Sequence, residues 1–156
     1  MARAYGAEND WGSMQVARYP RRLTGFCAVN PVRDYAQREI ERCSKDPNLR
    51  TGLKLRFGNS DVNLGIDEHV ERTRAIFAAA NAHGMAIVVH AHANIDHNRP
   101  YGAKQARAFL ERLLPAAQNV TVALGVYAEA IPGSGVFILR RPAFPSPECG
   151  NKAPRC

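Results

Sequence analysis

The chain has 156 residues and a net charge of +7, with 46% hydrophobic and 22% charged residues. This composition is sufficient for one ordinary core and excludes a wholly disordered chain. No apolar run approaches the roughly 18 residues that a membrane helix requires, and no apolar stretch of signal-peptide length follows Met1. We therefore expect a soluble, cytoplasmic protein without a membrane partner.

The positive charge is concentrated at the C-terminal end. The last 17 residues carry four basic residues and one acid, which accounts for +3 of the +7. Upstream, basic residues alternate with acids, and aromatic residues make up only 8% of the chain. This distribution argues against a nucleic-acid partner. Half of the ten prolines lie beyond residue 130, so we assign residues 1–130 to the folded part and residues 131–156 to an irregular, basic, proline-rich tail.

Hydrophobic spacing and turn residues predict alternating helices and strands along the folded part. The first predicted elements are a short helix capped by Asp10 and reaching Ala17, a strand at 23–29, and a helix capped by Asp34 and ending before Pro47. A strand at 51–57, a helix from Asp67 to His83 and an apolar strand at 85–90 follow. The last predicted elements are a helix over 106–114, a strand at 120–124 and a short strand at 136–139. The apolar run at 85–90 predicts a strand that is buried on both faces.

This alternation indicates right-handed βαβ units and a parallel sheet. Ligands of such sheets bind at the carboxyl ends of the strands. The residues that end the predicted strands therefore become candidate site residues, namely Asn30, Arg56 and His90.

Two histidines lie at the end of the apolar strand at 85–90. His90 and His92 lie two residues apart, so their imidazoles point to the same face if the strand continues. Two converging imidazoles at this edge suit zinc or another divalent metal. The alternative is that His90 is a hydrogen-bonded core histidine and His92 a surface residue.

Lys54 and Arg56 alternate with leucines in the strand at 51–57. The alternation directs both basic side chains to the face opposite Leu53 and Leu55. There they are candidates for contact with a substrate anion. The alternative is that Lys54 extends its ammonium group into water at the end of a strand. No catalytic residue is assigned.

The four cysteines form no C-x-x-C pair, which argues against a cysteine zinc knuckle. Cys27 falls in a predicted strand and Cys43 on the apolar face of a predicted helix. We interpret both as small buried hydrophobic residues and not as disulfide partners. Cys149 and Cys156 lie in the tail.

Several longer segments resemble amidohydrolase family 2, the TIM-barrel metal-dependent hydrolases that are related to decarboxylases of aromatic acids. The resemblance covers roughly residues 9–123 and is carried by Asn9-Asp10-Trp11, QVARYP (15–20), GFCAVNP (25–31), GLKLRFGNS (52–60), IVVH (87–90), RPYG (99–102) and QARAFLERLLPAA (105–117). It implies a (β/α)₈ barrel with a divalent metal, usually zinc, at the carboxyl face, where the metal activates water or orients a carboxylate. His90 matches the metal-binding histidine that ends a mid-barrel strand. Lys54 matches the lysine of a G-x-K-L-H pattern, in which Arg56 replaces the histidine.

The chain departs from the family pattern in length and in ligands. A whole barrel needs about 250 residues, and the family's first-strand H-x-H and its late aspartate have no counterpart here. In the family, the next strand after that of His90 ends with a histidine that is followed by glycines. The segment 122–126 has no histidine, and a change of reading frame near codon 123 is one explanation. We therefore expect a partial TIM barrel of about four to five parallel strands with flanking helices, truncated at both ends.

The predicted function is that of a fragment of a metal-dependent hydrolase or decarboxylase (lyase) acting on a small carboxylic or cyclic substrate. A single retained ligand, His90, cannot complete a three-ligand zinc site, so weak or no catalysis is expected. Unpaired edge strands would favour association between copies of the chain. Two alternatives are a non-enzymatic scaffold fragment that binds an acidic partner through its basic tail, and a small complete doubly wound domain.

Overall fold

A computed structural model describes residues 5–92, 102–127 and 136–139. They form one five-stranded sheet in the order β1-β2-β3-β4-β5. The strands are β1 (Cys27–Ala28), β2 (Gly52–Arg56), β3 (Ala86–His92), β4 (Val122–Tyr127) and β5 (Val136–Leu139). Strands β1 to β4 are mutually parallel, whereas β5 pairs with β4 in the antiparallel direction. The prediction of four parallel strands is confirmed, and a fifth parallel strand is not found among the described residues.

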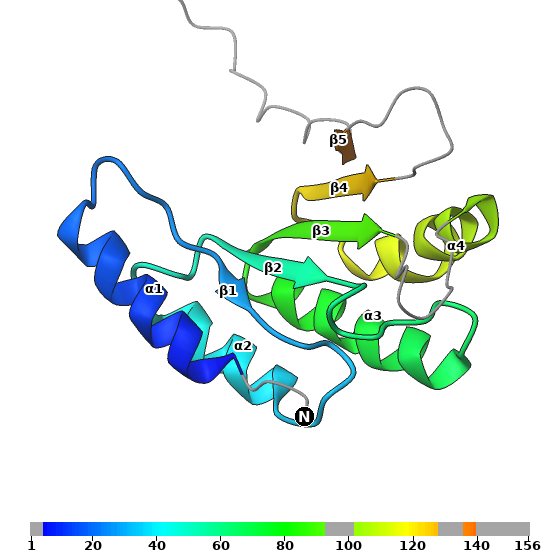
Figure 1. The fold of residues 1–156 in the computed structure, drawn as a ribbon, viewed down its shortest axis with the longest axis horizontal. Helices are drawn as coiled ribbons and strands as arrows, with labels where there is room; N and C mark the ends of the chain where they lie inside the picture. The colour runs from blue at the N-terminus through cyan, green and yellow to red at the C-terminus, as the bar shows by residue number, and fades with distance from the viewer. Residues whose placement is uncertain (1–4, 93–101, 128–135, 140–156) are drawn as a thin grey trace, which may run out of the picture.

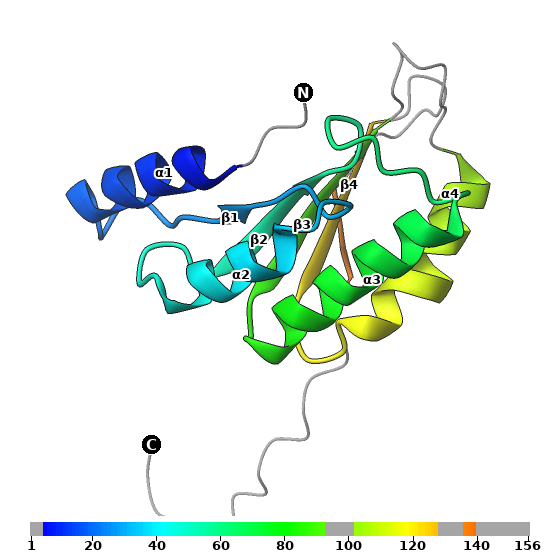
Figure 2. The ribbon, with the colours of Figure 1, turned by 90° about the horizontal axis from the view of Figure 1, so that it is seen from below.

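The helices are α1 (Gly6–Arg18), α2 (Ala36–Lys45), α3 (Asp67–Ala82) and α4 (Ala103–Ala108). A π-helical turn at Phe109–Leu113 and a 3₁₀ turn at Leu114–Ala116 continue α4. Helices α2, α3 and α4 lie on one face of the sheet, while α1 lies beside the edge strand β1 (Figures 1 and 2). The parallel strands follow chain order without reversal, which differs from a doubly wound sheet, whose strand order reverses and whose helices cover both faces.

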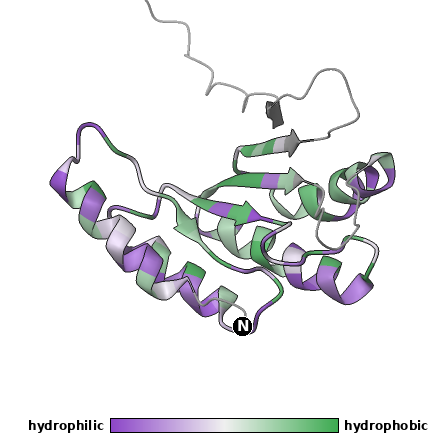
Figure 3. Ribbon diagram, in the orientation of Figure 1, coloured by the Kyte–Doolittle hydropathy of each residue, from purple (hydrophilic) through white to green (hydrophobic). Residues whose placement is uncertain are grey.

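The core lies between the sheet and these three helices. Leu53, Leu55, Ile87, Val89 and Ala91 of the central strands are fully buried on the helix side. Phe57, Phe77 and Phe109 pack beside them, with ring centroids of Phe77 and Phe109 5.7 Å apart in an edge-to-face arrangement. Figure 3 shows that β3 and β4 are mostly hydrophobic, whereas α1 and α2 carry many polar residues.

The opposite face of the sheet differs from the prediction for 85–90. Ala86, Val88 and His90 alternate with the buried residues of β3 and are only half-buried, because no described helix covers this face. We call it the uncovered face, in the sense that no helix among residues 5–92 and 102–127 lies on it. The apolar run indicated burial on both faces, but the described helices pack against one face of β3 only. An apolar sequence cannot by itself distinguish these two environments, since valine and alanine are found in both.

Several predicted boundaries and caps are corrected. Helix α1 begins four residues before Asp10, whose carboxylate instead pairs with Arg42 at 2.6 Å. Asp34 does not cap α2, because it pairs with Arg72 at 2.6 Å. The predicted strand at 23–29 is reduced to two residues. By contrast, the predicted end of α3 is confirmed by Gly84, whose φ of +67° favours glycine.

No described helix is both long and apolar enough to cross a membrane. The predicted tail falls mostly outside the described residues, apart from β5.

Candidate functional site

The uncovered face carries Lys54, Arg56 and His90 on two neighbouring strands. Lys54 is half-buried in the middle of β2 and Arg56 is exposed at its end, while His90 is half-buried near the end of β3. Arg56 lies directly beside His90 in the register of the sheet, and neighbouring strands are about 4.8 Å apart. The three side chains therefore share one face of the sheet, and Arg56 and His90 also share one end of it. The alternation with Leu53 and Leu55 predicted the common face of Lys54 and Arg56.

Backbone hydrogen bonds hold the ends of these two strands together. The Phe57 N–H donates to the carbonyl oxygen of His90 at 3.0 Å, which extends the pairing beyond Arg56. The Ser60 N–H then donates to the Arg56 carbonyl oxygen at 3.1 Å as the chain turns away from β2. Phe57 itself is buried against Phe109, with ring centroids 6.4 Å apart. The strand ends that bear Arg56 and His90 are thus anchored in the core.

The electrostatics of this face favour an anion. Burial lowers the pKa of the Lys54 ammonium, and the positive charge of Arg56 lowers it further. Other arginines of the chain, such as Arg42 and Arg112, pair with acids. Within residues 5–91 and 102–125, no side-chain hydrogen bond or ion pair links Lys54 or Arg56 to an acid. Two unmatched cations on one face are therefore available to a negatively charged ligand.

The described donor atoms around His90 do not make a zinc site. His90 belongs to no group of three metal-ligating side chains among the described residues, and its register neighbour Arg56 is a cation that would repel a metal ion. His92 ends β3, and its backbone pairs with Tyr127. Its side chain lies outside the described part of the structure. A zinc ion held by His90 or His92 remains a prediction, and no step of chemistry is derived through it.

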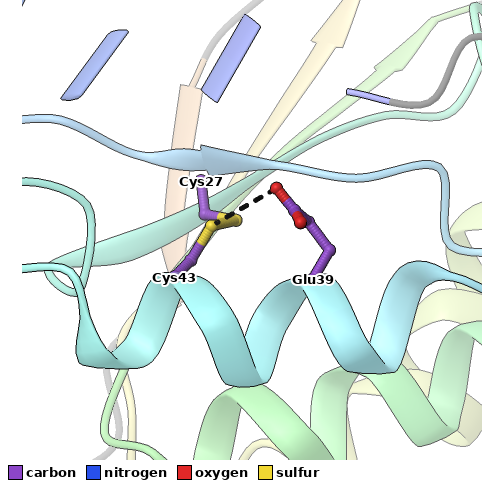
Figure 4. Close-up of side chains that lie close together, drawn as sticks. All are labelled: Cys27, Glu39 and Cys43. Atoms are coloured by element: carbon purple, nitrogen blue, oxygen red, sulfur yellow. Dashed lines mark hydrogen bonds between the residues drawn. A yellow bond between two sulfur atoms is a disulfide. The ribbon is translucent and has the colours of Figure 1, made fainter. Parts of the chain in front are cut away.

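A second polar cluster lies at the interface of α1, β1 and α2, and sequence reasoning missed it. Cys27 and Cys43 are both fully buried and form a disulfide with a Cα–Cα distance of 6.0 Å (Figure 4). The interpretation of these cysteines as unpaired hydrophobic residues is therefore wrong. Cys27 lies on β1 and Cys43 on the inner face of α2. Because the helix packs back onto the strand, the two side chains meet.

Glu39 and Asn9 complete this cluster. The Glu39 side chain is only 11% exposed, and its Oε1 lies 3.9 Å from the Cys43 sulfur. The Asn9 amide donates to Glu39 Oε1 at 2.6 Å and lies 3.6 Å from the Cys27 sulfur. The Arg42 guanidinium contacts both carboxylate oxygens, at 2.7 and 2.9 Å. Hydrogen bonding by Arg42 lowers the Glu39 pKa, burial opposes this effect, and Asn9 reinforces it.

A sequence signal for this cluster does exist. Glu39 and Cys43 are four residues apart on one helix and therefore share a face. Cys43 also follows Ile40 at the spacing of the buried side of α2. That spacing indicated burial correctly, but it gave no information about which strand residue lies opposite. The partner depends on how α2 sits on β1, which is a property of the tertiary structure.

No family model, no curated protein and no solved structure matches this chain. The resemblance to amidohydrolase family 2 therefore stays a prediction from the sequence motifs.

Proposed function

We propose that this chain is a fragment of an amidohydrolase-type barrel that binds a small carboxylate on the uncovered face of its sheet, with weak or no catalysis of its own. The parent reaction would be hydrolysis or non-oxidative decarboxylation of a small carboxylic or cyclic substrate. The observation that carries the proposal is the pair of unmatched cations, Lys54 and Arg56, on one face of β2.

The arrangement of the sheet supports the barrel interpretation. In a TIM barrel, parallel strands follow chain order and every helix lies on the outside. The order β1-β2-β3-β4 and the position of α2, α3 and α4 on one face agree with this pattern. The uncovered face would then correspond to the barrel interior, where substrates of such enzymes bind at the carboxyl ends of the strands.

The chemistry of the two cations suits a carboxylate. The planar guanidinium of Arg56 can donate two parallel hydrogen bonds to the two carboxylate oxygens. Lys54 contributes a compact positive charge that is partly removed from water, where an ion pair is stronger than at a fully exposed site. The half-buried His90 lies beside Arg56 in the register of the sheet, so it borders the same site.

The described residues supply one candidate zinc ligand at this face, His90, whereas a catalytic zinc needs three protein ligands. We therefore propose binding without efficient turnover. Zinc analysis of the purified protein and of His90→Ala tests this point. Stoichiometric zinc that His90→Ala abolishes would contradict the proposal that catalysis has been lost.

Binding can be measured by isothermal titration calorimetry or NMR with benzoate as the probe and benzyl alcohol as the neutral comparison. We expect wild-type protein to bind benzoate and not benzyl alcohol. Arg56→Gln should weaken binding by about tenfold or more, because a hydrogen bond to a charged group is lost. Arg50→Gln is the matched control, since Arg50 is an exposed arginine that precedes β2 at the opposite end. Equal losses in both variants would overturn the proposal.

A further inference from the structure

The Cys27–Cys43 disulfide lies beside an ionised carboxylate. Outside the uncovered face, the three possible metal-ligand atoms of Cys27, Glu39 and Cys43 all lie within 4.8 Å of one another. This is the single group of three or more His, Cys, Asp or Glu ligands among the described residues. Figure 4 shows the Glu39 carboxylate turned toward the two sulfur atoms, one helical turn from Cys43.

The spacing fits one metal ion once the disulfide is opened. Zinc forms bonds of about 2.3 Å to thiolate sulfur and about 2.1 Å to carboxylate oxygen. A single ion therefore bridges atoms that are separated by up to about 4.6 Å. Glu39 and Cys43 are held on the same face of α2, and β1 fixes Cys27 opposite them. The proposed site needs these side chains to rotate so that the three ligand atoms surround one centre.

The charges also fit a divalent cation. Two thiolates and one carboxylate bring three negative charges, so a bound divalent ion leaves a net charge of −1. The Arg42 guanidinium contacts both Glu39 oxygens and also pairs with Asp10, so it offsets part of this remaining charge. Asn9 donates to Glu39 Oε1 and to the carbonyl oxygen of Ala28, and so orients the carboxylate from the other side. Such outer partners orient metal ligands in known sites.

We propose that reduction of the Cys27–Cys43 disulfide converts this cluster into a binding site for one zinc ion or another thiophilic divalent cation, with Glu39 as the third ligand. A dithiol reductant supplies two electrons and two protons, which break the S–S bond and yield two thiols, while the reductant becomes a disulfide. Binding of the metal then forms two metal–sulfur bonds and releases both thiol protons to water. Disulfide and metal are therefore alternative states of the same two cysteines.

This inference is independent of the proposed carboxylate site, because it uses none of Lys54, Arg56 or His90. It also predicts that the cell compartment decides whether the cluster is in its disulfide state or its metal-binding state. In a reducing cytosol cysteines are kept as thiols, and the metal-binding state would prevail, whereas an oxidising compartment would favour the disulfide.

The test uses cobalt(II) and zinc(II) with full-length protein in which Cys149→Ser and Cys156→Ser remove the tail thiols. We expect the protein reduced with a phosphine to bind one cobalt ion, with thiolate-to-cobalt charge-transfer and visible d–d absorption that one equivalent of zinc abolishes. Zinc binding should release two protons per ion, as measured with a pH indicator. The oxidised protein should bind no stoichiometric metal.

Two variants of α2 distinguish the loss of a metal ligand from a general change in the helix. Glu39→Gln keeps both cysteines and should weaken zinc binding by about tenfold or more. Glu41→Gln, an exposed neighbour on the same helix, should bind like the parent, and so should His90→Ala. Metal binding that persists in Cys27→Ser, that is unchanged by Glu39→Gln, or that is the same in oxidised and reduced protein would overturn the proposal.

Discussion

The side-chain amide of Asn9 pairs with both backbone polar groups of Ala28. Its nitrogen donates to the Ala28 carbonyl oxygen at 2.9 Å, and its oxygen accepts from the Ala28 N–H at 2.8 Å. In a parallel strand both groups of one residue point to the same side, so Asn9 occupies the place that a neighbouring strand would take beside β1. On the other side of the parallel strands, β4 is paired with β5. Association between copies through exposed strand edges therefore stays a prediction, and these contacts at both edges do not favour it.

Asn9→Ala should destabilise the protein substantially. It leaves the Ala28 N–H and carbonyl without their partner, and each unsatisfied group costs about 1–3 kcal/mol. We expect the free energy of unfolding in urea to fall by about 2–6 kcal/mol. Asp10→Ala is the control, because the adjacent Asp10 is exposed and its ion pair with Arg42 contributes at most about 1 kcal/mol. A loss in Asn9→Ala no larger than in the control would contradict the proposed pairing.

Opening the disulfide should lower stability as well. Cys27 and Cys43 are 16 residues apart, and closing a loop of this length stabilises a protein by about 3 kcal/mol, because it restricts the unfolded chain. We expect reduced protein without metal to unfold at a lower urea concentration than oxidised protein. The same comparison in Cys27→Ala/Cys43→Ala should show no effect of reductant. If reductant destabilises that variant equally, the effect of the reductant comes from the tail cysteines and not from the Cys27–Cys43 disulfide.

Gly52→Ala should be destabilising for steric reasons. A methyl group at this position would meet the ring of Phe26 and would lie 2.7 Å from the carbonyl oxygen of Ala86 on the neighbouring strand. Crowding of this kind costs about 1–3 kcal/mol. Gly12→Ala is the opposite case, because Gly12 is inside α1 with nothing within 4 Å of the added carbon. That change should stabilise the protein by up to about 1 kcal/mol. Thermal or urea unfolding of both variants tests these two predictions.

Carboxylate binding should depend on the protonation of Lys54. Its pKa lies below the ordinary value of a lysine because of burial and of Arg56. Binding of benzoate should therefore be strong below this lowered pKa and should weaken as the pH rises through it. Lys54→Met should remove this pH dependence and leave the affinity near its high-pH level. Calorimetric titrations over pH provide the measurement.

The same lowered pKa has a consequence for folding. Because the charged form of Lys54 is less favourable in the folded protein than in the unfolded chain, the ammonium reduces stability at neutral pH. This penalty is lost as the pH rises through the folded pKa toward the unfolded value. At pH 7, Lys54→Met should thus raise stability or leave it within about 0.5 kcal/mol.

The local parts of the fold could be predicted from the sequence, and the non-local parts could not. Hydrophobic periodicity located α2 and α3, and the alternation around Lys54 predicted which way its side chain points, since both depend on near neighbours in the chain. The antiparallel direction of β5 and the disulfide depend on contacts between distant segments. Asp10 and Asp34 satisfied the local rule for helix caps, but arginines of other helices provide their partners instead. For the same reason, spacing could not predict that Arg56 lies beside His90.

The most direct measurement is an NMR pH titration of the lysine side chains with and without saturating benzoate, with the Lys54 signal assigned by its loss in Lys54→Met. We expect Lys54 to titrate below the ordinary pKa of a lysine and benzoate to shift its midpoint upward, because the bound anion stabilises the ammonium form. Titration of Lys54 at the ordinary pKa of a lysine, and no shift with benzoate, would contradict an anion site on the uncovered face.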